Sequence, residues 1–192
     1  MNAINKNLIK IKTVAVYCGS HTPPDPHYAE AAVDLANFMA LHEMTLVYGG
    51  SDVGIMKILA DAMLKCGGKV VGVFVEGLPM EIIHKNLTET VTAATLADRK
   101  AEMLRRADAV IALPGGFGTW DELFDALALR KKKKGGHKAP VGVLNVNGYF
   151  DHLLEFIRHS IETGFTSRRS AKLLKSASTP EALFHQLAGS VV

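Results

Sequence analysis

Cysteine is scarce in this sequence of 192 residues, and long apolar runs are missing from it. Its two cysteines, Cys18 and Cys66, show no metal-site spacing and form no disulfide framework, which suits a reducing cytosol. No apolar stretch approaches the roughly 18 residues of a membrane-spanning helix. The basic stretch 1–12 leads into a strand-like segment without a secretory cleavage site. These absences predict a cytoplasmic protein with no membrane partner.

Charge of one sign is also limited. The formal net charge is +3 and the sequence pI is about 8.8, a balance that does not by itself require nucleic acid as a partner. Hydrophobic residues make up 48% of the chain and charged residues 21%, so disorder is not expected. With no internal repeat and no linker, the sequence predicts a tail at 1–12 and a single domain at 13–192.

The common nucleotide-binding motifs are absent. No glycine-rich loop ends in Gly-Lys-Ser or Gly-Lys-Thr, so a P-loop is excluded. The dinucleotide motif would need an acid at the end of the second expected strand, which instead ends in Tyr48-Gly49-Gly50. NAD binding and ATP hydrolysis are therefore disfavoured.

Short β-branched runs alternate with longer amphipathic stretches. The expected strands are 13–18, 45–48, 69–75, 88–92, 109–113 and 141–146. The expected helices are 26–42, 54–65, 99–107, 120–131 and 150–163, and a last one opens at Thr179-Pro180-Glu181. Several strands are apolar throughout, as in sheets covered on both faces. This alternation predicts an α/β fold: a doubly wound, mostly parallel sheet with helices on both faces.

The unusual loops of the chain follow the ends of the expected strands. They are CGSH, YGGSDVG, VEGLPME, LADRK and PGGFGT, in chain order. Ligands of doubly wound sheets bind beyond the carboxyl ends of the strands. We therefore expect one ligand site to which several of these loops contribute.

The loop Gly115-Gly116-Phe117-Gly118-Thr119 predicts a phosphate site. Glycines let backbone N–H groups turn toward a ligand, and the following helix offers unpaired donors with a positive partial charge. The alternative is a tight strand-to-helix turn without a ligand.

Two charged dipeptides, Asp121-Glu122 and Arg99-Lys100, remain to be explained. Thr119 and Glu122 have the spacing of a capping box, but a phosphate at the same helix end would repel a carboxylate that only capped it. Glu122 is therefore also a candidate for the sugar hydroxyls or a water beside C1′. Arg99-Lys100 places two cations in the first turn of a helix capped by Asp98 or Thr95, against the helix dipole. Either they are an exposed pair or they face an anionic ligand or Glu122.

These stretches, in this order, resemble the LOG family, the cytokinin riboside 5′-monophosphate phosphoribohydrolases that are often labelled lysine decarboxylases. The family signature Pro-Gly-Gly-x-Gly-Thr-x-x-Glu is matched without a mismatch by residues 114–122. Arg99-Lys100 matches the Arg-Lys pair of the family, and Glu81 matches a substrate-contacting glutamate. The loops YCGS and YGGSDVGIM are similar to two earlier loops of the family.

The resemblance implies a Rossmann-like homodimer without a cofactor or metal. It would hydrolyse the N-glycosidic bond of nucleoside 5′-monophosphates, AMP or a cytokinin riboside 5′-monophosphate, to free base and ribose 5-phosphate. Arg99 and Glu122 are the implied catalytic pair. The implied substrate-binding residues are Ser20, Gly49, Gly50, Glu81, Arg99, Lys100, Gly115, Gly116, Phe117, Gly118, Thr119, Trp120, Asp121 and Glu122. Trp120 and Leu129 could face the partner subunit or lie in the protomer core.

Some positions depart from the family pattern, and they bear on the base pocket or the dimer contact. They are Leu96-Ala97, Ser51, Ala128, Leu129-Arg130 and the run Lys131 to Lys134. The lysine run is either a solvated helix end or a basic rim that attracts an anionic substrate.

Two other functions compete with hydrolysis. A carrier of a nucleotide or a phosphorylated cofactor would use the phosphate loop without needing Arg99 and Glu122 together. A lysine decarboxylase would need pyridoxal phosphate on a lysine, typically in a Ser-x-His-Lys context, whereas His137-Lys138 follows two glycines here.

Overall fold

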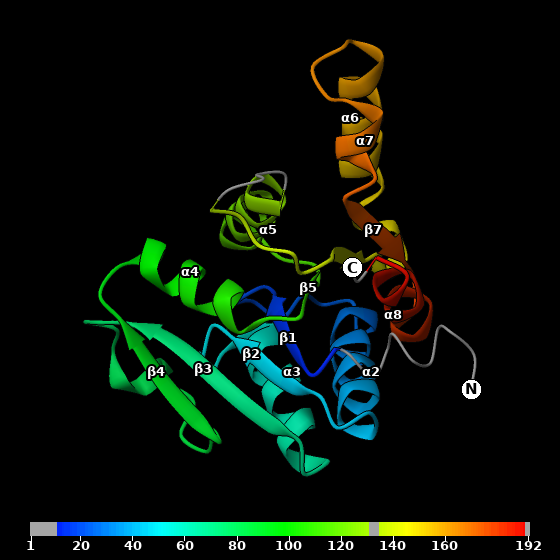
Figure 1. Cartoon of the computed structure of the whole chain (residues 1–192). Helices are drawn as coiled ribbons and strands as arrows, with labels where there is room; N and C mark the ends of the chain where they lie inside the picture. Colours follow the sequence, from blue (N-terminus) through cyan, green and yellow to red (C-terminus); the bar gives the residue numbers. More distant parts are fainter. Residues whose placement is uncertain (1–10, 131–134, 191–192) are drawn as a thin grey trace.

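The computed structural model describes residues 11–130 and 135–190 (Figure 1). The run Lys131 to Lys134 lies outside the described residues, and so does the tail up to residue 10. Ile11 and Lys12, which the sequence assigns to the tail, belong to the folded part. Ile11 is buried, and the backbone N–H of Lys12 donates to the carboxylate of Asp108 at 2.9 Å.

Seven parallel strands form one sheet in the described part of the chain. They are β1 (Thr13–Tyr17), β2 (Thr45–Tyr48), β3 (Lys69–Val75), β4 (Glu89–Ala93), β5 (Ala109–Ala112), β6 (Val141–Leu144) and β7 (Leu174–Ala177). Their order across the sheet is β4-β3-β2-β1-β5-β6-β7. The chain therefore winds outward from β1 in one direction and then, after β4, returns to the other side of β1. The predicted doubly wound α/β fold is confirmed.

Helices cover both faces of this sheet. They are α2 (His27–Leu41), α3 (Gly54–Lys65), α4 (Leu96–Arg106), α5 (Phe117–Arg130), α6 (Asp151–Glu162), α7 (Arg168–Ala171) and α8 (Pro180–Ala188). α2, α3 and α8 pack on one face, and α4 and α5 pack on the other. α6 and α7 project from the body of the molecule (Figure 1).

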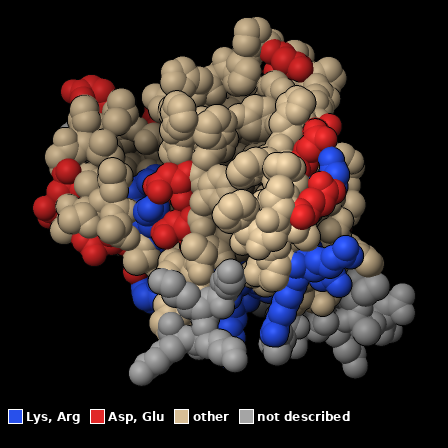
Figure 2. All heavy atoms as spheres, turned by 90° about the horizontal axis from the view of Figure 1, so that it is seen from above, with Lys and Arg blue, Asp and Glu red and all other residues tan. Residues whose placement is uncertain are grey.

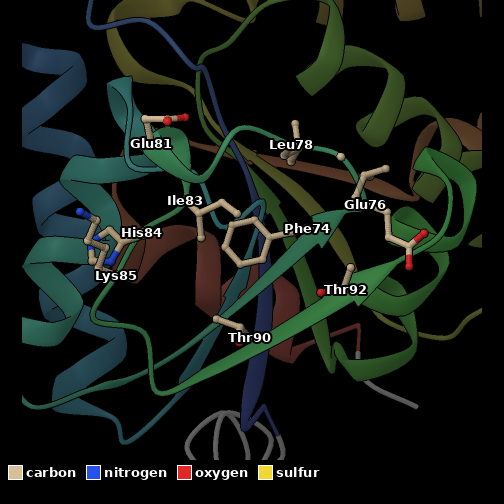
Figure 3. Close-up of a pocket in the computed structure, with 11 residues that line it drawn as sticks. Phe74, Glu76, Leu78, Glu81, Ile83, His84, Lys85, Thr90 and Thr92 are labelled. Carbon is tan, nitrogen blue, oxygen red and sulfur yellow. The ribbon is translucent and has the colours of Figure 1, made fainter.

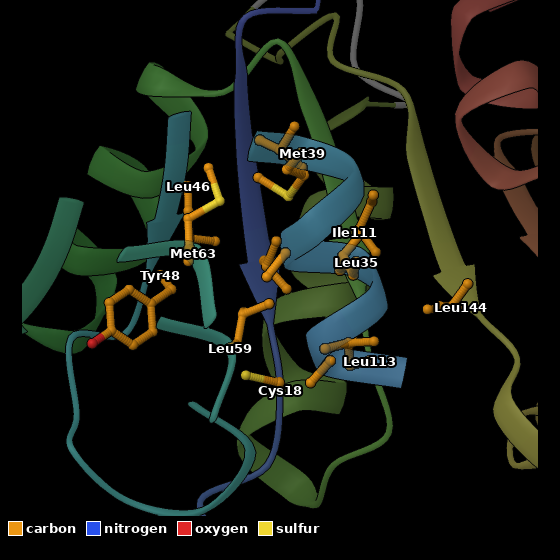
Figure 4. Packing of buried hydrophobic residues seen from close by; sticks show 14 of the residues in the cluster. Cys18, Leu35, Met39, Leu46, Tyr48, Leu59, Met63, Ile111, Leu113 and Leu144 are labelled. Carbon is orange, nitrogen blue, oxygen red and sulfur yellow. The ribbon is translucent and has the colours of Figure 1, made fainter. Parts of the chain in front are cut away.

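The central strand β1 shows how the sequence builds these layers. Successive strand residues point to opposite faces. Val14 and Val16 accordingly join the core with Leu35 of α2 and Leu59 of α3 (Figure 4). Ala15 and Tyr17 point the other way, toward α4 and α5. Because both faces are covered, β1 is apolar along its length and carries no alternating pattern.

Besides shifts of one or two residues in several bounds, the structure differs from the sequence prediction in the following elements. The strand β7 and the short helix α7 were not predicted. α4 begins at Leu96, since the hydroxyl of Thr95 accepts a hydrogen bond from the backbone N–H of Asp98 at 3.1 Å. α5 begins at Phe117, so Thr119 lies inside the helix and cannot act as its N-cap. The capping-box interpretation of Thr119 and Glu122 is therefore wrong.

None of the helices in the described ranges combines the length and the apolar character needed to cross a membrane.

Candidate active site

The candidate site lies where the winding of the sheet reverses, beyond the carboxyl ends of β1 and β5. This is the place where doubly wound sheets bind ligands. A hollow of about 600 Å³ opens there, within the range of small-molecule sites. Nine of the predicted site residues line it: Ser20, Arg99, Gly115, Gly116, Phe117, Gly118, Thr119, Trp120 and Glu122.

The glycine loop is held close to the loop after β1. The N–H of Leu113 donates to the carbonyl of Tyr17 at 2.9 Å, and the N–H of Gly19 donates to the carbonyl of Pro114 at 3.3 Å. A Cβ on Gly115 would overlap the hydroxyl of Thr119 and crowd Gly19, so only glycine fits at position 115. The backbone can therefore approach a ligand closely at the start of α5.

The start of α5 is open to the hollow. The N–H of Trp120 donates to the carbonyl of Gly116 at 3.1 Å. The N–H groups that precede it in the first turn are those that an α-helix leaves without an intrahelical acceptor. Such N–H groups and the helix dipole favour a negatively charged ligand, which is the chemistry that the sequence predicts for this loop.

Arg99 and Glu122 meet in the wall of the hollow. An Nη of Arg99 donates to Oε1 of Glu122 at 2.8 Å, and Nε of Arg99 donates to the carbonyl of Val73 in β3 at 2.8 Å. The side chains are only 16% and 12% exposed. A Cβ on Gly49 would overlap the guanidinium, so the glycine at the end of β2 leaves room for it. The cation at position 99 is thus explained by Glu122, one of the expected alternatives.

Burial controls the protonation of Glu122. Loss of water raises the pKa of its carboxyl group above the usual range, and the positive charge of Arg99 opposes this shift without cancelling it. Beneath the pair, burial raises the pKa values of the Tyr17 phenol and the Cys18 thiol, so both stay neutral at pH 7. Glu122 therefore sits in surroundings of low polarity, where one charge has a large effect.

The neighbouring residues form a second ion pair outside the hollow. Nζ of Lys100 lies 3.0 Å from the carboxylate of Asp121 and 3.6 Å from that of Asp125. Asp121 is 65% exposed. Neither Lys100 nor Asp121 lines the hollow, although the sequence assigns both to substrate binding.

The remaining predicted residues follow β2 and β3. Gly50 follows Gly49, and Phe74 packs against it, leaving no space for a Cβ. Glu81 lies in the short 3-10 helix η1 (Met80–Ile82) and lines a separate hollow of about 850 Å³ beside β3 and β4 (Figure 3). The structure therefore places Glu81 outside the hollow that holds Arg99 and Glu122.

Sequence reasoning missed several lining residues, of which Tyr149 is the clearest. It follows β6, and its hydroxyl donates to the carbonyl of Gly115 at 2.6 Å. Tyr28 meets it edge to face, with ring centroids 6.0 Å apart. Met56 of α3 also lines the hollow. The position of Tyr149 just beyond a strand end was the one signal available for it.

Among the residues that the structure describes, no group of three or more His, Cys, Asp or Glu side chains could hold a metal ion.

Comparison with known proteins decides the family. The model of a family described as "Possible lysine decarboxylase" matches residues 56–187. The cytokinin riboside 5′-monophosphate phosphoribohydrolase LOG7 of Arabidopsis thaliana is 40% identical over 179 residues, covering 93% of this chain and 82% of that protein. LOG4 of the same plant is 39% identical over 190 residues, covering 97% and 87%. The chain belongs to the LOG family. The signature 114–122 and the pair Arg99-Lys100 had pointed to this family, and the prediction is confirmed.

Solved structures confirm the fold of this LOG-family chain. The molybdenum cofactor binding protein of Rippkaea orientalis matches with a TM-score of 0.70 at 22% identity, covering 94% of this chain and 98% of that one. The molybdenum cofactor carrier protein of Chlamydomonas reinhardtii matches with a TM-score of 0.69 at 19% identity, covering 93% and 97%. At such identities the likeness concerns the fold alone.

Proposed function

We propose that this LOG-family chain hydrolyses the N-glycosidic bond of nucleoside 5′-monophosphates, AMP or a cytokinin riboside 5′-monophosphate. The products are the free base and ribose 5-phosphate. One observation carries the proposal: a buried Arg99–Glu122 pair and the first turn of α5, whose unpaired N–H groups favour an anion, line the same hollow. Curated relatives named for this activity support it. The two free cysteines, one of them exposed, support a cytoplasmic location.

In the proposed mechanism, the phosphate binds at the first turn of α5, with the hydroxyls of Thr119 and Ser20 near it. The ribose then lies toward Glu122. The bond between C1′ and the base nitrogen breaks, and an oxocarbenium-like ribose forms, as in glycoside hydrolysis generally. The carboxylate of Glu122 stabilises this cation or orients the attacking water. The water oxygen bonds to C1′, one of its protons stays on the new hydroxyl, and the other is transferred to the base.

Arg99 has a separate role in this proposal. Bound to Glu122 and to the carbonyl of Val73, it fixes the carboxylate and balances charge near the phosphate. Lys100 and Asp121 remain proposed contributors to substrate binding. Their charges, just outside the hollow, would act on the substrate through the electrostatic potential at its entrance. Glu81 remains a proposed substrate contact, and it would reach the ligand from the loop between β3 and β4.

A comparison of AMP with adenosine tests the proposal. Interactions with the non-reacting phosphate can be used to stabilise the transition state, so AMP should be cleaved at least about 100-fold faster in kcat/KM. Adenine release is followed by chromatography. Equal rates for the nucleotide and the nucleoside would contradict the phosphate site. Absence of free base with every nucleoside monophosphate tried would contradict the activity itself.

The competing functions explain the hollow less well. A carrier needs the phosphate loop, but a buried ion pair beside the sugar position is costly unless it is used. A lysine decarboxylase needs a lysine at its cofactor, and no lysine is among the described residues that line the hollow. His137 is used elsewhere, since its Nε2 bonds to the carbonyl of Ala126 at 2.7 Å.

We also propose that the protein is a homodimer formed through α5 and α6. Phe124 of α5 and Phe156 of α6 are 45% and 63% exposed, and with Trp120 and Tyr149 they line an apolar hollow of about 600 Å³. Trp120 and Tyr149 also line the candidate active site, so a second copy on this face would adjoin it. Figure 2 shows a face with a broad central area free of charged side chains. Leu129 packs on the core of its own protomer instead.

Light scattering tests the dimer. The protein should be dimeric at micromolar concentration, and Phe156→Arg should be monomeric with reduced base release. Leu41→Arg is the matched control, since Leu41 is 79% exposed at the end of α2, on the other face of the sheet. A fully active monomeric wild-type protein would contradict the proposal.

A further inference from the structure

A buried histidine outside the proposed chemistry lines the hollow of about 850 Å³ that also holds Glu81. His84 follows η1, and its side chain is 3% exposed. Its Nε2 lies 3.0 Å from Oδ1 of Asp61 in α3. Figure 3 shows Glu81, Ile83 and His84 along one segment, with His84 beside the neighbouring helix. A buried histidine usually has both ring nitrogens engaged, and here each has a partner.

The tautomer of His84 follows from those partners. The backbone N–H of Asn86 donates to Nδ1 at 3.3 Å, so Nδ1 acts as an acceptor. In the neutral ring the other nitrogen then carries the hydrogen. Nε2 therefore donates to Asp61, and this bond ties the segment after η1 to α3.

The same segment is tied by its backbone to the loop after β2. The N–H of Asp52 donates to the carbonyl of Ile82 at 2.8 Å, and the N–H of His84 donates to the carbonyl of Gly50 at 3.0 Å. Ser51 and Ile83 form an antiparallel bridge. Lys57 of α3 completes the link, because its Nζ lies 2.5 Å from Asp52 and 3.3 Å from Asp61.

This loop touches the proposed catalytic pair. A Cβ on Gly49 would overlap the guanidinium of Arg99, and a Cβ on Gly54 would overlap the backbone of Ser20. Gly49, at the start of the loop 49–54, therefore forms the surface against which Arg99 rests. The segment tied to it carries Glu81. Displacement of either part would move groups on the sugar and base side while leaving the start of α5 in place.

We propose that His84 and Asp61 are positioning residues that hold the loop 49–54 and the segment of Glu81 in register with Arg99. The expected loss of kcat rests on the proposed hydrolysis. The structural link between the two segments does not. A displacement of about 1 Å near reacting groups can cost about 100-fold in rate. Ser20 borders the loop through Gly54, but the phosphate binds mainly at the first turn of α5, so its affinity should change by no more than about threefold.

Kinetics of four variants test the proposal. His84→Ala and Asp61→Ala should lower kcat for AMP by roughly 10- to 100-fold. Inhibition by ribose 5-phosphate should stay within about threefold of wild type, because the product still reaches α5. His84→Gln keeps an N–H near the Nε2 position, and Asp61→Asn keeps an acceptor, so both should recover most of the loss. An unchanged kcat in His84→Ala would overturn the proposal, and so would a parallel loss of ribose 5-phosphate affinity.

Two measurements separate this proposal from general destabilisation and from failure of the function. Leu187→Ala removes buried volume in α8, which packs on β6, β7 and α2, and should lower the melting temperature without changing kcat. Hydrogen exchange of the Asp52, His84 and Asn86 amides should speed up in His84→Ala and in Asp61→Ala, but not in Leu187→Ala. This readout needs no substrate. Unchanged protection of these amides would refute the link even if the protein released no base at all.

Discussion

Two adjacent ion pairs are built from the same two dipeptides, yet they differ in almost everything that matters chemically. Arg99-Lys100 of α4 faces Asp121-Glu122 of α5. The inner pair, Arg99 with Glu122, is buried and is anchored to the carbonyl of Val73. The outer pair, Lys100 with Asp121, has a carboxylate that is 65% exposed.

The comparison teaches that burial, more than distance, separates a reactive pair from a surface pair. The N–O separations are 2.8 and 3.0 Å, so the contacts are nearly equal in length. An exposed pair is worth about 0–1 kcal/mol because water screens it. In the inner pair the same charges act through a medium of low polarity, where they are less screened and more costly to leave unpaired.

The first prediction removes the inner carboxylate. Glu122→Gln should lower base release from AMP by about 100-fold or more, the scale of losing one electrostatic contact to a transition state. The melting temperature should fall by only a few degrees, because the amide oxygen still accepts from Arg99 and the lost desolvation cost of the carboxylate offsets part of the lost counter-charge. Single-turnover assays and calorimetry measure the two effects. Near-normal base release would exclude Glu122 from the chemistry.

The second prediction concerns the cation of the inner pair. Arg99→Ala should lower kcat to a similar extent, and Arg99→Lys should recover little, because a lysine cannot hold both Glu122 and the Val73 carbonyl in one plane. The double variant with Glu122→Gln should lose less than the sum of the single losses, since residues that act as a unit are not additive. Full additivity would mean that the two side chains act independently.

The third prediction is the pH dependence of the inner pair. The pKa of Glu122 is raised, so its proton is retained to a higher pH than in an ordinary glutamic acid. The acid limb of kcat/KM should therefore lie above the usual glutamate range, with activity lost as pH falls through it. Arg99 lowers this pKa, so Arg99→Ala should raise it further, as carbon NMR of the labelled carboxyl can show. A downward shift in that variant would contradict the assigned cause.

The fourth and smallest effect belongs to the outer pair. Asp121→Asn should change stability by no more than about 1 kcal/mol and kcat by no more than about fivefold. Any rise in KM should fade as salt exceeds about 0.1 M, where the screening length is about 10 Å. Titration with NaCl tests this. A salt-independent loss as large as that of Glu122→Gln would erase the distinction between the pairs.

Local patterns in the sequence were enough to predict most of the sheet. Apolar β-branched runs predict β2 and β3 with the bounds that the structure has. The missed strand, β7, is a short edge strand, LKSA, with a single large apolar side chain. Its pairing with β6 comes from the fold, so nothing local distinguishes it from a loop.

The site was predictable only where a motif carried it. The signature 114–122 could be recognised by the spacing of its glycines. Arg99 could be recognised because a cation in the first turn of a helix opposes the helix dipole. His84 leaves no such trace, and Tyr149 leaves only its position beyond a strand end, because each acts through a contact 23 or 34 residues away in the chain. The start of α5 was placed too late because Gly118 is a weak helix former, and the packing of Thr119 against Gly115 outweighs that preference.

Gly49 gives this site an adjustable part. The guanidinium of Arg99 packs directly against the backbone of Gly49. Side-chain volume at position 49 would therefore change the distances from this guanidinium to Glu122 and to the carbonyl of Val73. Alanine, serine and valine at this position form a graded series of wedges that alters the geometry while every reacting group keeps its chemical identity. In such a series, the slope of log kcat against added side-chain volume measures how sensitive the reaction is to displacement of the Arg99 guanidinium.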